Sequence, residues 1–268
     1  MHITSRDNSL LRNVRAVRDG KIEEQIFVEG LRLCEEALRS QLEIEAVVVS
    51  EELLRKERVA GVIKELSQAS RRFASVSEKL LESVSYTKTP QGIIVLAQRP
   101  EASESRLAAS LAANPLLVVL HQINNPVNVG AILRTSEAAG AAGVIATKNT
   151  SDPFSPKSLR GAMGSAFRLP IWSGPAYGEV IEWCRQRGIV TVCADVDATT
   201  SYTEIDWVGP SALILGPEST GLTQEELELA DHRVSIPMKG MAESLNVAVA
   251  AGILLFESNR QRYTDNTE

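Results

Sequence analysis

Polar side chains gather where three apolar runs of the sequence give way to loops. The run 116–123 is followed by NNPVNVGAILRTSEAAG, the run 212–215 by GPESTGL, and the run 232–236 by PMKGMAESLNVAVAAG. The polar and glycine residues of interest in these loops are Asn128, Arg134, Glu218, Ser244, Asn246, Gly216, Gly221 and Gly240. A guanidinium, a carboxylate, two amides and a hydroxyl can together bind and orient a polar substrate, so the three loops form a candidate catalytic site.

A phosphate-binding loop is one interpretation of the middle segment. Gly216, Gly221 and Thr223 have the spacing of the pattern G-x-x-x-x-G-K-[ST], but Leu222 stands where the pattern requires lysine. For the acidic partner that such a site needs, the sequence offers only two weak candidates, Asp195 and Asp197. The segment therefore predicts a glycine-shaped turn that lets the backbone approach a ligand other than a triphosphate.

Each of the five polar side chains also has a structural alternative. Asn128 or Ser244 could cap a helix. Arg134 could pair with Glu137, and Glu218 could lie near a helix N-terminus and interact with its dipole. A purely structural sheet edge does not need so many special residues at the ends of three strands, which favours a functional site.

A mostly parallel sheet would bring the three loops together. In residues 115–268 continuously apolar runs alternate with helical patterns, which predicts an α/β domain whose sheet is covered on both faces. The predicted strands are 116–120, 143–147, 167–172, 189–194, 212–215 and 232–236, and the predicted helices are 127–139, 177–187, 223–230 and 244–259. Ligands of such sheets bind beyond the carboxyl ends of the strands.

A smaller α/β domain is predicted for residues 1–98, with a linker at 99–114. Its strands are expected at 27–30, 44–50, 72–76 and 92–97, between helical patterns such as 8–18 and 31–40. The basic residues Arg12, Arg15, Arg18, Arg71 and Arg72 could bind the phosphates of a nucleic acid, although a solvated helix face is the simpler explanation of such charges taken alone. Phosphate contacts of this kind position a nucleic acid without reading its sequence.

Composition narrows the class of protein. The chain has 268 residues, 44% of them hydrophobic and 23% charged, with a net charge of −6, which is typical of a globular protein with a sizeable core. The apolar run 247–256 is too short to span a bilayer, and the N-terminus lacks a signal peptide, so we expect a cytoplasmic protein without a membrane partner. Three scattered cysteines and three scattered histidines predict neither disulfides nor a bound metal.

The three loops resemble the ordered motifs of the SpoU/TrmH family of RNA ribose 2′-O-methyltransferases, which belong to the SPOUT class. The resemblance rests on N-x-G-x-x-x-R from Asn128 to Arg134, on LGPESTGL, and on IPMKGMAESLNVAVA, and it spans residues 118–256. A weaker similarity, in FVEGLRLCEEAL and TPQGIIVLA, links the N-terminal half to the ribosomal-protein-like substrate-binding domain of many members.

This resemblance implies a fold and a cofactor that periodicity alone does not predict. The fold is a C-terminal deep trefoil knot, whose loops hold S-adenosylmethionine, in a protein that forms homodimers. The positions that match the family's cofactor contacts are Leu215, Gly216, Ile236, Met238, Ser244 and Leu245. The glycine-bracketed turn would then meet an adenosine, which needs no lysine, so Leu222 fits the resemblance.

The resemblance also implies an activity. Arg134 would act at the ribose 2′-hydroxyl, where a guanidinium is better suited to binding a phosphate and stabilising a developing alkoxide than to acting as a base. Asn128 and Glu218 would orient Arg134 or the ribose, Asn246 would position the ribose or its loop, and Ser244 matches a further polar position. The expected substrate is 23S ribosomal RNA; the alternatives are transfer RNA, or a non-catalytic RNA-binding protein that keeps the fold.

Overall fold

The computed structural model describes residues 1–265, with side chains as far as Tyr263. The chain forms two compact units. The first contains Met1–Pro100 together with Phe154–Arg168, and the second contains Glu101–Pro153 together with the chain from Leu169 onward. Among the described residues no helix is both long and apolar enough to cross a bilayer.

The first unit is built on a mixed five-stranded sheet in the order β1-β4-β3-β5-β2. Its strands are β1 (His2–Ile3), β2 (Gln25–Glu29), β3 (Ile44–Ser50), β4 (Arg72–Val76) and β5 (Ile93–Gln98). Strands β1, β4 and β3 run parallel, whereas β5 pairs antiparallel with both β3 and β2. Strand β3 is buried along its whole length, as expected for the central strand of a covered sheet.

Short helices surround this sheet. They are α1 (Ser9–Arg18), α2 (Leu31–Arg39), α3 (Glu51–Leu54), η1 (Glu57–Val59), α4 (Ala60–Ala69), α5 (Glu78–Glu82), α8 (Pro156–Ala162) and α9 (Ser165–Arg168). Helix α1 buries Leu10, Leu11, Val14 and Val17, whose spacing gives the helix one apolar face. That face joins residues of β3, β4 and β5 in a single hydrophobic core.

The second unit contains a six-stranded sheet in which every strand pair is parallel, which confirms the predicted parallel α/β architecture. The strand order is β11-β9-β10-β6-β7-β8. The strands are β6 (Leu116–Leu120), β7 (Gly143–Ala146), β8 (Ile171–Ser173), β9 (Val190–Ala194), β10 (Ser211–Leu215) and β11 (His232–Val234). The central strands β6 and β10 are buried at every residue, so their sequences are continuously apolar.

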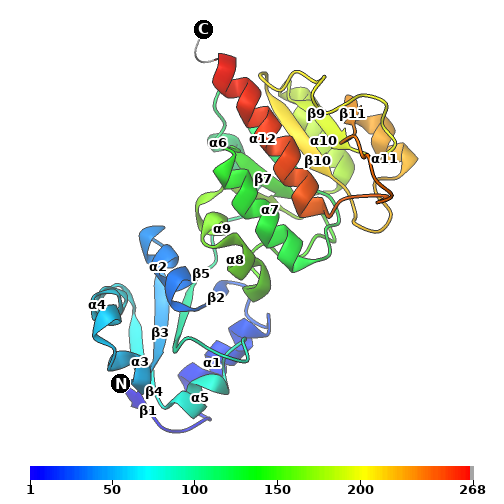
Figure 1. Ribbon diagram of the computed structural model, residues 1–268. Helices are drawn as coiled ribbons and strands as arrows, with labels where there is room; N and C mark the ends of the chain where they lie inside the picture. The colour runs from blue at the N-terminus through cyan, green and yellow to red at the C-terminus, as the bar shows by residue number, and fades with distance from the viewer. Residues whose placement is uncertain (266–268) are drawn as a thin grey trace. The chain divides into compact units, whose positions relative to one another are not determined.

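Helices pack on both faces of this sheet (Figure 1). They are α6 (Glu104–Ala109), α7 (Pro126–Ala138), α10 (Tyr177–Gln186), α11 (Gln224–Leu229) and α12 (Val247–Asp265). Helices α7 and α12 pack directly against each other, and Figure 1 shows them side by side in green and red. Trp183 and Val180 of α10 join Leu117 and Ile214 of the sheet in a hydrophobic core.

Two predicted elements were wrong in detail. The run 167–172 was predicted as a strand, but residues 165–168 form helix α9 and the strand β8 begins only at Ile171. The last helix was predicted to begin near Ser244, but it begins at Val247 because Asn246 caps it. The Asn246 Oδ1 atom accepts the backbone N–H of Ala248 at 2.9 Å.

Candidate functional site

The candidate site lies at the point of the second sheet where successive strands are added first on one side of β6 and then on the other. Strand β6 has β7 on one side and β10 on the other, and the chain builds outward from it in both directions. Ligands of open parallel sheets bind at such a switch point, beyond the carboxyl ends of the strands. The loops after Leu120 and Leu215 leave the sheet at this place, because these two residues are paired in register.

A hydrogen-bonded chain of three side chains joins all three predicted segments. Asn246 Nδ2 donates to Asn128 Oδ1 at 3.3 Å, and Asn128 Nδ2 donates to Glu218 Oε1 at 2.7 Å. Asn128 is buried, and it does not cap its helix, since Asn125 accepts the N–H of Val127 instead. The segments after β6 and β10 and the segment before α12 therefore meet at one point.

A cavity of about 680 Å³ lies beside this chain of hydrogen bonds. Its volume is within the range of pockets that hold small organic ligands, roughly 300–1,000 Å³. The lining includes every residue predicted to contact a cofactor, namely Leu215, Gly216, Ile236, Met238, Ser244 and Leu245. Glu218 and Asn246 also line it, so with Ser244 three of the five polar residues border the same space.

The glycine-bracketed turn forms one wall of the cavity. Residues Gly216–Leu222, called here the Gly216 loop, run from the end of β10 to the residue that caps α11. A Cβ atom on Gly216 would lie 2.8 Å from Leu222 Cγ and 3.0 Å from Leu222 N, so only glycine fits here. Gly221 has a φ of 64°, a left-handed conformation that glycine adopts without strain. Leu222 thus packs where a phosphate-binding loop would place lysine.

The cavity lining is acidic. Asp195, Asp197, Glu218 and Glu243 contribute carboxylates, and Arg233 contributes a guanidinium. Arg233 is engaged by Asp195 Oδ2, which accepts from Nε at 3.0 Å and from Nη2 at 2.5 Å. Asp197 and Glu243 remain as additional negative charge, which suits a ligand that carries positive charge. Sequence reasoning missed these residues as ligand contacts, although Asp195 and Asp197 follow β9 directly and the strand-end rule points to them.

Arg134 lies away from the cavity lining. It is exposed on α7, six residues beyond Asn128, which corresponds to about 9 Å along a helix axis. Among the described residues its side chain forms no ion pair or hydrogen bond, so the alternative of a pair with Glu137 is not observed. The structure thus brings together Asn128, Glu218 and Asn246 and places Arg134 on the same helix as Asn128, with its charge free.

The five predicted RNA-binding arginines have different surroundings in the first unit. Arg71 forms ion pairs with Glu43 and Glu45, and Arg18 with Asp19 at 2.8 Å. Arg15 donates to the carbonyl of Arg6. Arg12 and Arg72 are exposed. Carboxylate partners offset part of the positive charge of Arg71 and Arg18, so the strongest candidates for phosphate contact are Arg12, Arg15 and Arg72.

The cysteines are suited to packing and not to nucleophilic chemistry. Cys34, Cys184 and Cys193 are all buried and free. Burial raises the pKa of Cys184 to about 12 and that of Cys193 to about 11, so these thiols stay neutral near pH 7. In the described part of the chain no group of three or more His, Cys, Asp or Glu side chains is arranged to hold a metal ion.

Comparison with known sequences identifies two family matches. The sequence profile of the SpoU rRNA Methylase family matches residues 115–256, and that of the MRM3-like substrate binding domain matches residues 11–95. A tRNA/rRNA methyltransferase of Synechocystis sp., described as uncharacterised, is 31% identical over 273 residues, covering 99% of this chain and 96% of its own. The 23S rRNA (guanosine-2′-O-)-methyltransferase RlmB of Ralstonia nicotianae is 33% identical over 210 residues, covering 78% of this chain and 84% of its own.

A solved structure is similar over nearly the whole chain. The crystal structure of an AdoMet-bound rRNA methyltransferase from Sinorhizobium meliloti matches with a TM-score of 0.85 and 30% sequence identity. The match covers 97% of this chain and 97% of that one. Both units therefore have counterparts in one protein whose structure contains AdoMet.

Proposed function

The chain belongs to the SpoU rRNA methylase family, and we propose that it transfers a methyl group from S-adenosylmethionine to a ribose 2′-hydroxyl of 23S ribosomal RNA. The observation that carries this proposal is the cavity at the switch point, bordered by the hydrogen-bonded chain from Asn246 through Asn128 to Glu218. The family match and the AdoMet-bound neighbour supply the chemistry that the cavity alone leaves open.

The residues around the cavity fit S-adenosylmethionine. Leu215, Ile236 and Leu245 offer apolar surface for an adenosine, and the Gly216 loop lets backbone come close to it. The carboxylates of Asp197 and Glu243 suit the positive charges of the sulfonium and the amino group. When bound, the cofactor supplies a methyl group on a positively charged sulfur, which is the electrophile of the reaction.

The polar residues would hold the ribose against this electrophile. Glu218 Oε1 is occupied by Asn128, while Glu218 Oε2 has no hydrogen-bond partner among the described residues and is available to a ribose hydroxyl. Asn246 fixes Asn128 and caps α12, so one side chain links the substrate position to the last helix. Holding two reactants in near-attack geometry can supply roughly 7–11 kcal/mol of a reaction barrier. Ser244 lines the cavity and is proposed as a further polar contact.

Arg134 would bind the RNA phosphate next to the reacting sugar. A guanidinium is not deprotonated in proteins, so we assign it to phosphate binding and to stabilising the alkoxide as the 2′-hydroxyl loses its proton. The side chain is exposed and has no partner among the described residues, which supports this role because its charge can engage a substrate phosphate. The 2′-hydroxyl requirement makes RNA the substrate.

The first unit would grip the RNA backbone. It contains the match to the MRM3-like substrate binding domain and the exposed Arg12 and Arg72. Residues 1–98 and 115–268 are proposed as the two functional domains, and the segment 99–114 between them contains helix α6, which belongs to the second unit. Ribosomal RNA is the first-choice substrate because the relative RlmB acts on 23S rRNA by name. A substrate of this kind also supports a cytoplasmic location.

A deep trefoil knot is proposed for the second unit. After completing β9, the chain inserts β10 between β9 and β6 and then crosses to β11 beyond β9. The segment that follows β11 lines the cavity through Ile236, Met238 and Leu245 before α12 begins. This re-entry between strands formed earlier supports a knotted path, which is otherwise rare in proteins.

We propose that the protein works as a homodimer. Val249 and Phe256 lie seven residues apart on α12, so they share one helix face, and their exposed fractions are 51% and 52%. Val127 of the adjoining helix α7 is 45% exposed. Exposed apolar side chains on two adjacent helices are the compositional sign of a subunit interface.

The test is a methyl-transfer assay with tritiated S-adenosylmethionine. Purified 23S rRNA and transfer RNA should be offered separately, and the product should be hydrolysed with alkali, because a 2′-O-methyl group makes its linkage resistant. Label in an alkali-resistant dinucleotide from 23S rRNA supports the proposal. Label only in transfer RNA would move the substrate to that class, and cofactor binding without transfer to either RNA would indicate a non-catalytic RNA-binding protein.

A further inference from the structure

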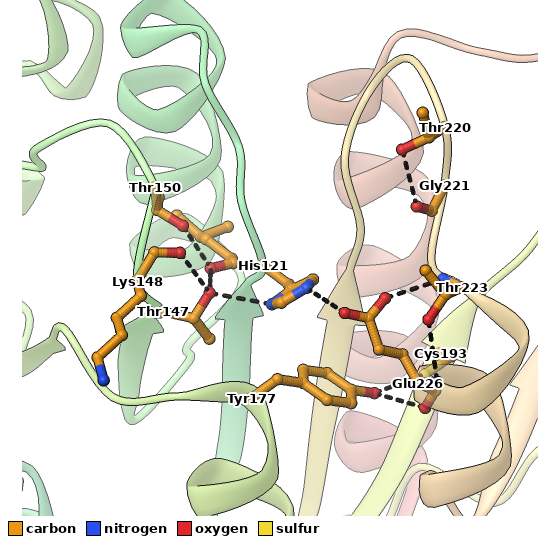
Figure 2. Close-up of polar contacts among 11 residues, drawn as sticks. His121, Thr147, Lys148, Thr150, Tyr177, Cys193, Thr220, Gly221, Thr223 and Glu226 are labelled. Carbon is orange, nitrogen blue, oxygen red and sulfur yellow. Dashed lines mark hydrogen bonds and ion pairs between the residues drawn. The ribbon is translucent and has the colours of Figure 1, made fainter.

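A buried histidine beside the site takes no part in the chemistry proposed above. His121 is the first residue after β6, and 3% of its surface is exposed. Its Nδ1 atom lies 3.0 Å from Thr147 Oγ1, and its Nε2 atom lies 2.9 Å from Glu226 Oε1 (Figure 2). Both ring nitrogens are therefore satisfied by side chains from other parts of the chain, one of them 105 residues away.

The charge of the Glu226 carboxylate decides which atom donates the hydrogen bond between His121 and Glu226. Burial tends to raise the pKa of Glu226, but the Thr223 N–H and hydroxyl and the His121 ring outweigh it and hold the pKa below the usual range. An ionised carboxylate only accepts, so His121 Nε2 must carry the proton and donate. The Thr147 hydroxyl can either donate to Nδ1 or accept from it, so the contact persists whether the ring is neutral or charged.

Glu226 in turn holds the C-terminal end of the Gly216 loop through Thr223. Its Oε2 accepts the N–H of Thr223 at 2.8 Å, and its own N–H donates to Thr223 Oγ1 at 3.3 Å, which is a capping box for α11. The Tyr177 hydroxyl donates to the Glu226 carbonyl at 3.0 Å, and the Tyr177 and His121 rings lie 4.7 Å apart. The carboxylate thus has one oxygen for the cap and one for His121.

The start of the Gly216 loop is held by His121 itself. The backbone N–H of His121 donates to the carbonyl of Leu215 at 2.9 Å, directly before Gly216. Figure 2 shows His121 between the Thr147 side of the site and the strand and helix that bracket the loop. Between these two anchors lies Glu218, whose carboxylate meets Asn128. One residue therefore holds the loop where it begins and, through Glu226, where it ends.

We propose that His121 is a positioning residue that anchors the Gly216 loop through the hydrogen bond from its Nε2 atom to Glu226, and so sets the shape of the cofactor cavity. This inference rests on the proposed function for the identity of the ligand. The expected effect on the loop does not depend on the proposed function, because it can be measured in the unliganded protein. Without the donor at Nε2, Glu226 keeps its cap but loses the tie to the sheet, and the loop gains freedom that ligand binding must then remove.

The test compares two replacements that differ in reach. In His121→Gln the side-chain amide reaches the position of Nε2 and can donate to Glu226, whereas in His121→Asn the amide is too short. Both replacements remove the ring, so both leave a similar space. Because a hydrogen bond to a charged group is among the stronger ones, we expect His121→Asn to raise the Kd for S-adenosylmethionine by about tenfold or more, with His121→Gln within about threefold of the parent.

Hydrogen–deuterium exchange of the unliganded protein gives a second readout. Amides 217–223 should exchange faster in His121→Asn than in the parent and close to the parent rate in His121→Gln. Thr150→Val serves as the matched control, since the Thr150 hydroxyl donates to the Leu120 carbonyl beside His121 without touching the ring. This control should leave both the Kd and the exchange of the loop close to the parent.

A double variant guards against general loss of stability. Glu226→Ala removes both the cap of α11 and the His121 contact, so it should weaken binding at least as much as His121→Asn does. Combining the two changes should cost little more than Glu226→Ala alone, because the His121 contact is already absent there. Equal effects of His121→Asn and His121→Gln, or unchanged loop exchange in a folded His121→Asn protein, would overturn the inference. A parent protein that transfers no methyl to RNA would refute the proposed function, while the exchange comparison would still decide the role of His121.

Discussion

Asn128 and Glu218 are separated by 90 positions in the sequence, yet Asn128 Nδ2 donates to Glu218 Oε1 at 2.7 Å. The contact joins the first turn of α7, which follows β6, to the loop after β10, and β6 and β10 are neighbouring strands of the parallel sheet. The buried amide thus fixes the direction of a carboxylate that borders the cavity. The charge of the donor side chain should therefore matter more than its size.

Replacing Asn128 with Asp tests this relationship. The substitution preserves shape but sets two carboxylates within hydrogen-bonding distance, where like charges repel and Glu218 must turn away. We expect kcat/KM for RNA methylation to fall about 100-fold, as for a misplaced catalytic group, while the Kd for S-adenosylmethionine changes much less. Asn124→Asp, at an exposed position in the loop before α7, is the control. Equal activity of the two variants would show that the contact has no role in orientation.

Arg134 provides a test of phosphate binding. Its side chain is exposed and does not line the cavity, so Arg134→Ala should leave the Kd for S-adenosylmethionine unchanged. Turnover should fall about 100-fold or more, because a charge that stabilises the transition state is lost. Arg134→Lys should recover part of this loss, since lysine keeps the charge but not the bidentate geometry. Near-normal turnover of the alanine variant, measured with saturating donor, would refute the assigned role.

The sequence predicted the sheet well because its strands are continuously apolar and its loops carry the polar residues. Residues 167–172 were misassigned because a short apolar run has the same appearance in a buried helix turn and in a strand. Ser244 was considered as a cap, whereas Asn246 caps α12 while also reaching Asn128. No local pattern signals that second contact, because its partner lies 118 positions away.

The pair of His121 and Glu226 shows the same limit more clearly. Each residue is unremarkable in its own segment, where His121 ends an apolar run and Glu226 completes a capping box. Their contact depends on the strand order that places β10 beside β6, and this order is not written in any single segment. The sequence therefore predicted that the polar loops meet at one edge of a parallel sheet, but it did not predict individual contacts such as this one, which depend on the strand order.

Gly216 tests the close approach within the loop. In Gly216→Ala the added Cβ would meet Leu222 Cγ at 2.8 Å and the Leu222 backbone N at 3.0 Å, so the loop must shift. Overpacking of this kind costs about 1–3 kcal/mol, and we expect the Kd for S-adenosylmethionine to rise about tenfold or more by calorimetry. Gly209→Ala is the control, because its Cβ would meet nothing within 4 Å. Similar affinities of both variants would contradict the tight fit.

Asp231 allows a prediction about pH. Burial tends to raise its pKa, but the N–H and hydroxyl of Thr191, which donate at 2.8 and 2.7 Å, outweigh it and hold the pKa below its usual range. A lowered pKa stabilises the fold above the unfolded value near 3.9, and this contribution is lost as the pH falls through the lower folded pKa.

Asp231→Asn should therefore lower the free energy of unfolding by about 1 kcal/mol at pH 7, the usual contribution of such hydrogen bonds at a partly exposed site. The difference from the parent should shrink as the pH falls below about 4, where the parent carboxylate becomes protonated. Urea unfolding at a series of pH values measures this. Glu204→Gln, at an exposed position, should change little at any pH, and a difference for Asp231→Asn that grows towards acid would contradict the sign of the shift.

The apolar face of α12 gives the last prediction. Phe256 is 52% exposed and shares a helix face with Val249, so a second copy of the chain would cover both side chains. Phe256→Glu would bury a carboxylate at that interface, which costs several kcal/mol without a partner charge. Light scattering should then show half the molar mass of the parent. Leu229→Glu replaces a comparably exposed residue on α11 and should remain dimeric. A parent that is already monomeric, or a Phe256→Glu protein that stays dimeric, would exclude this face as the interface.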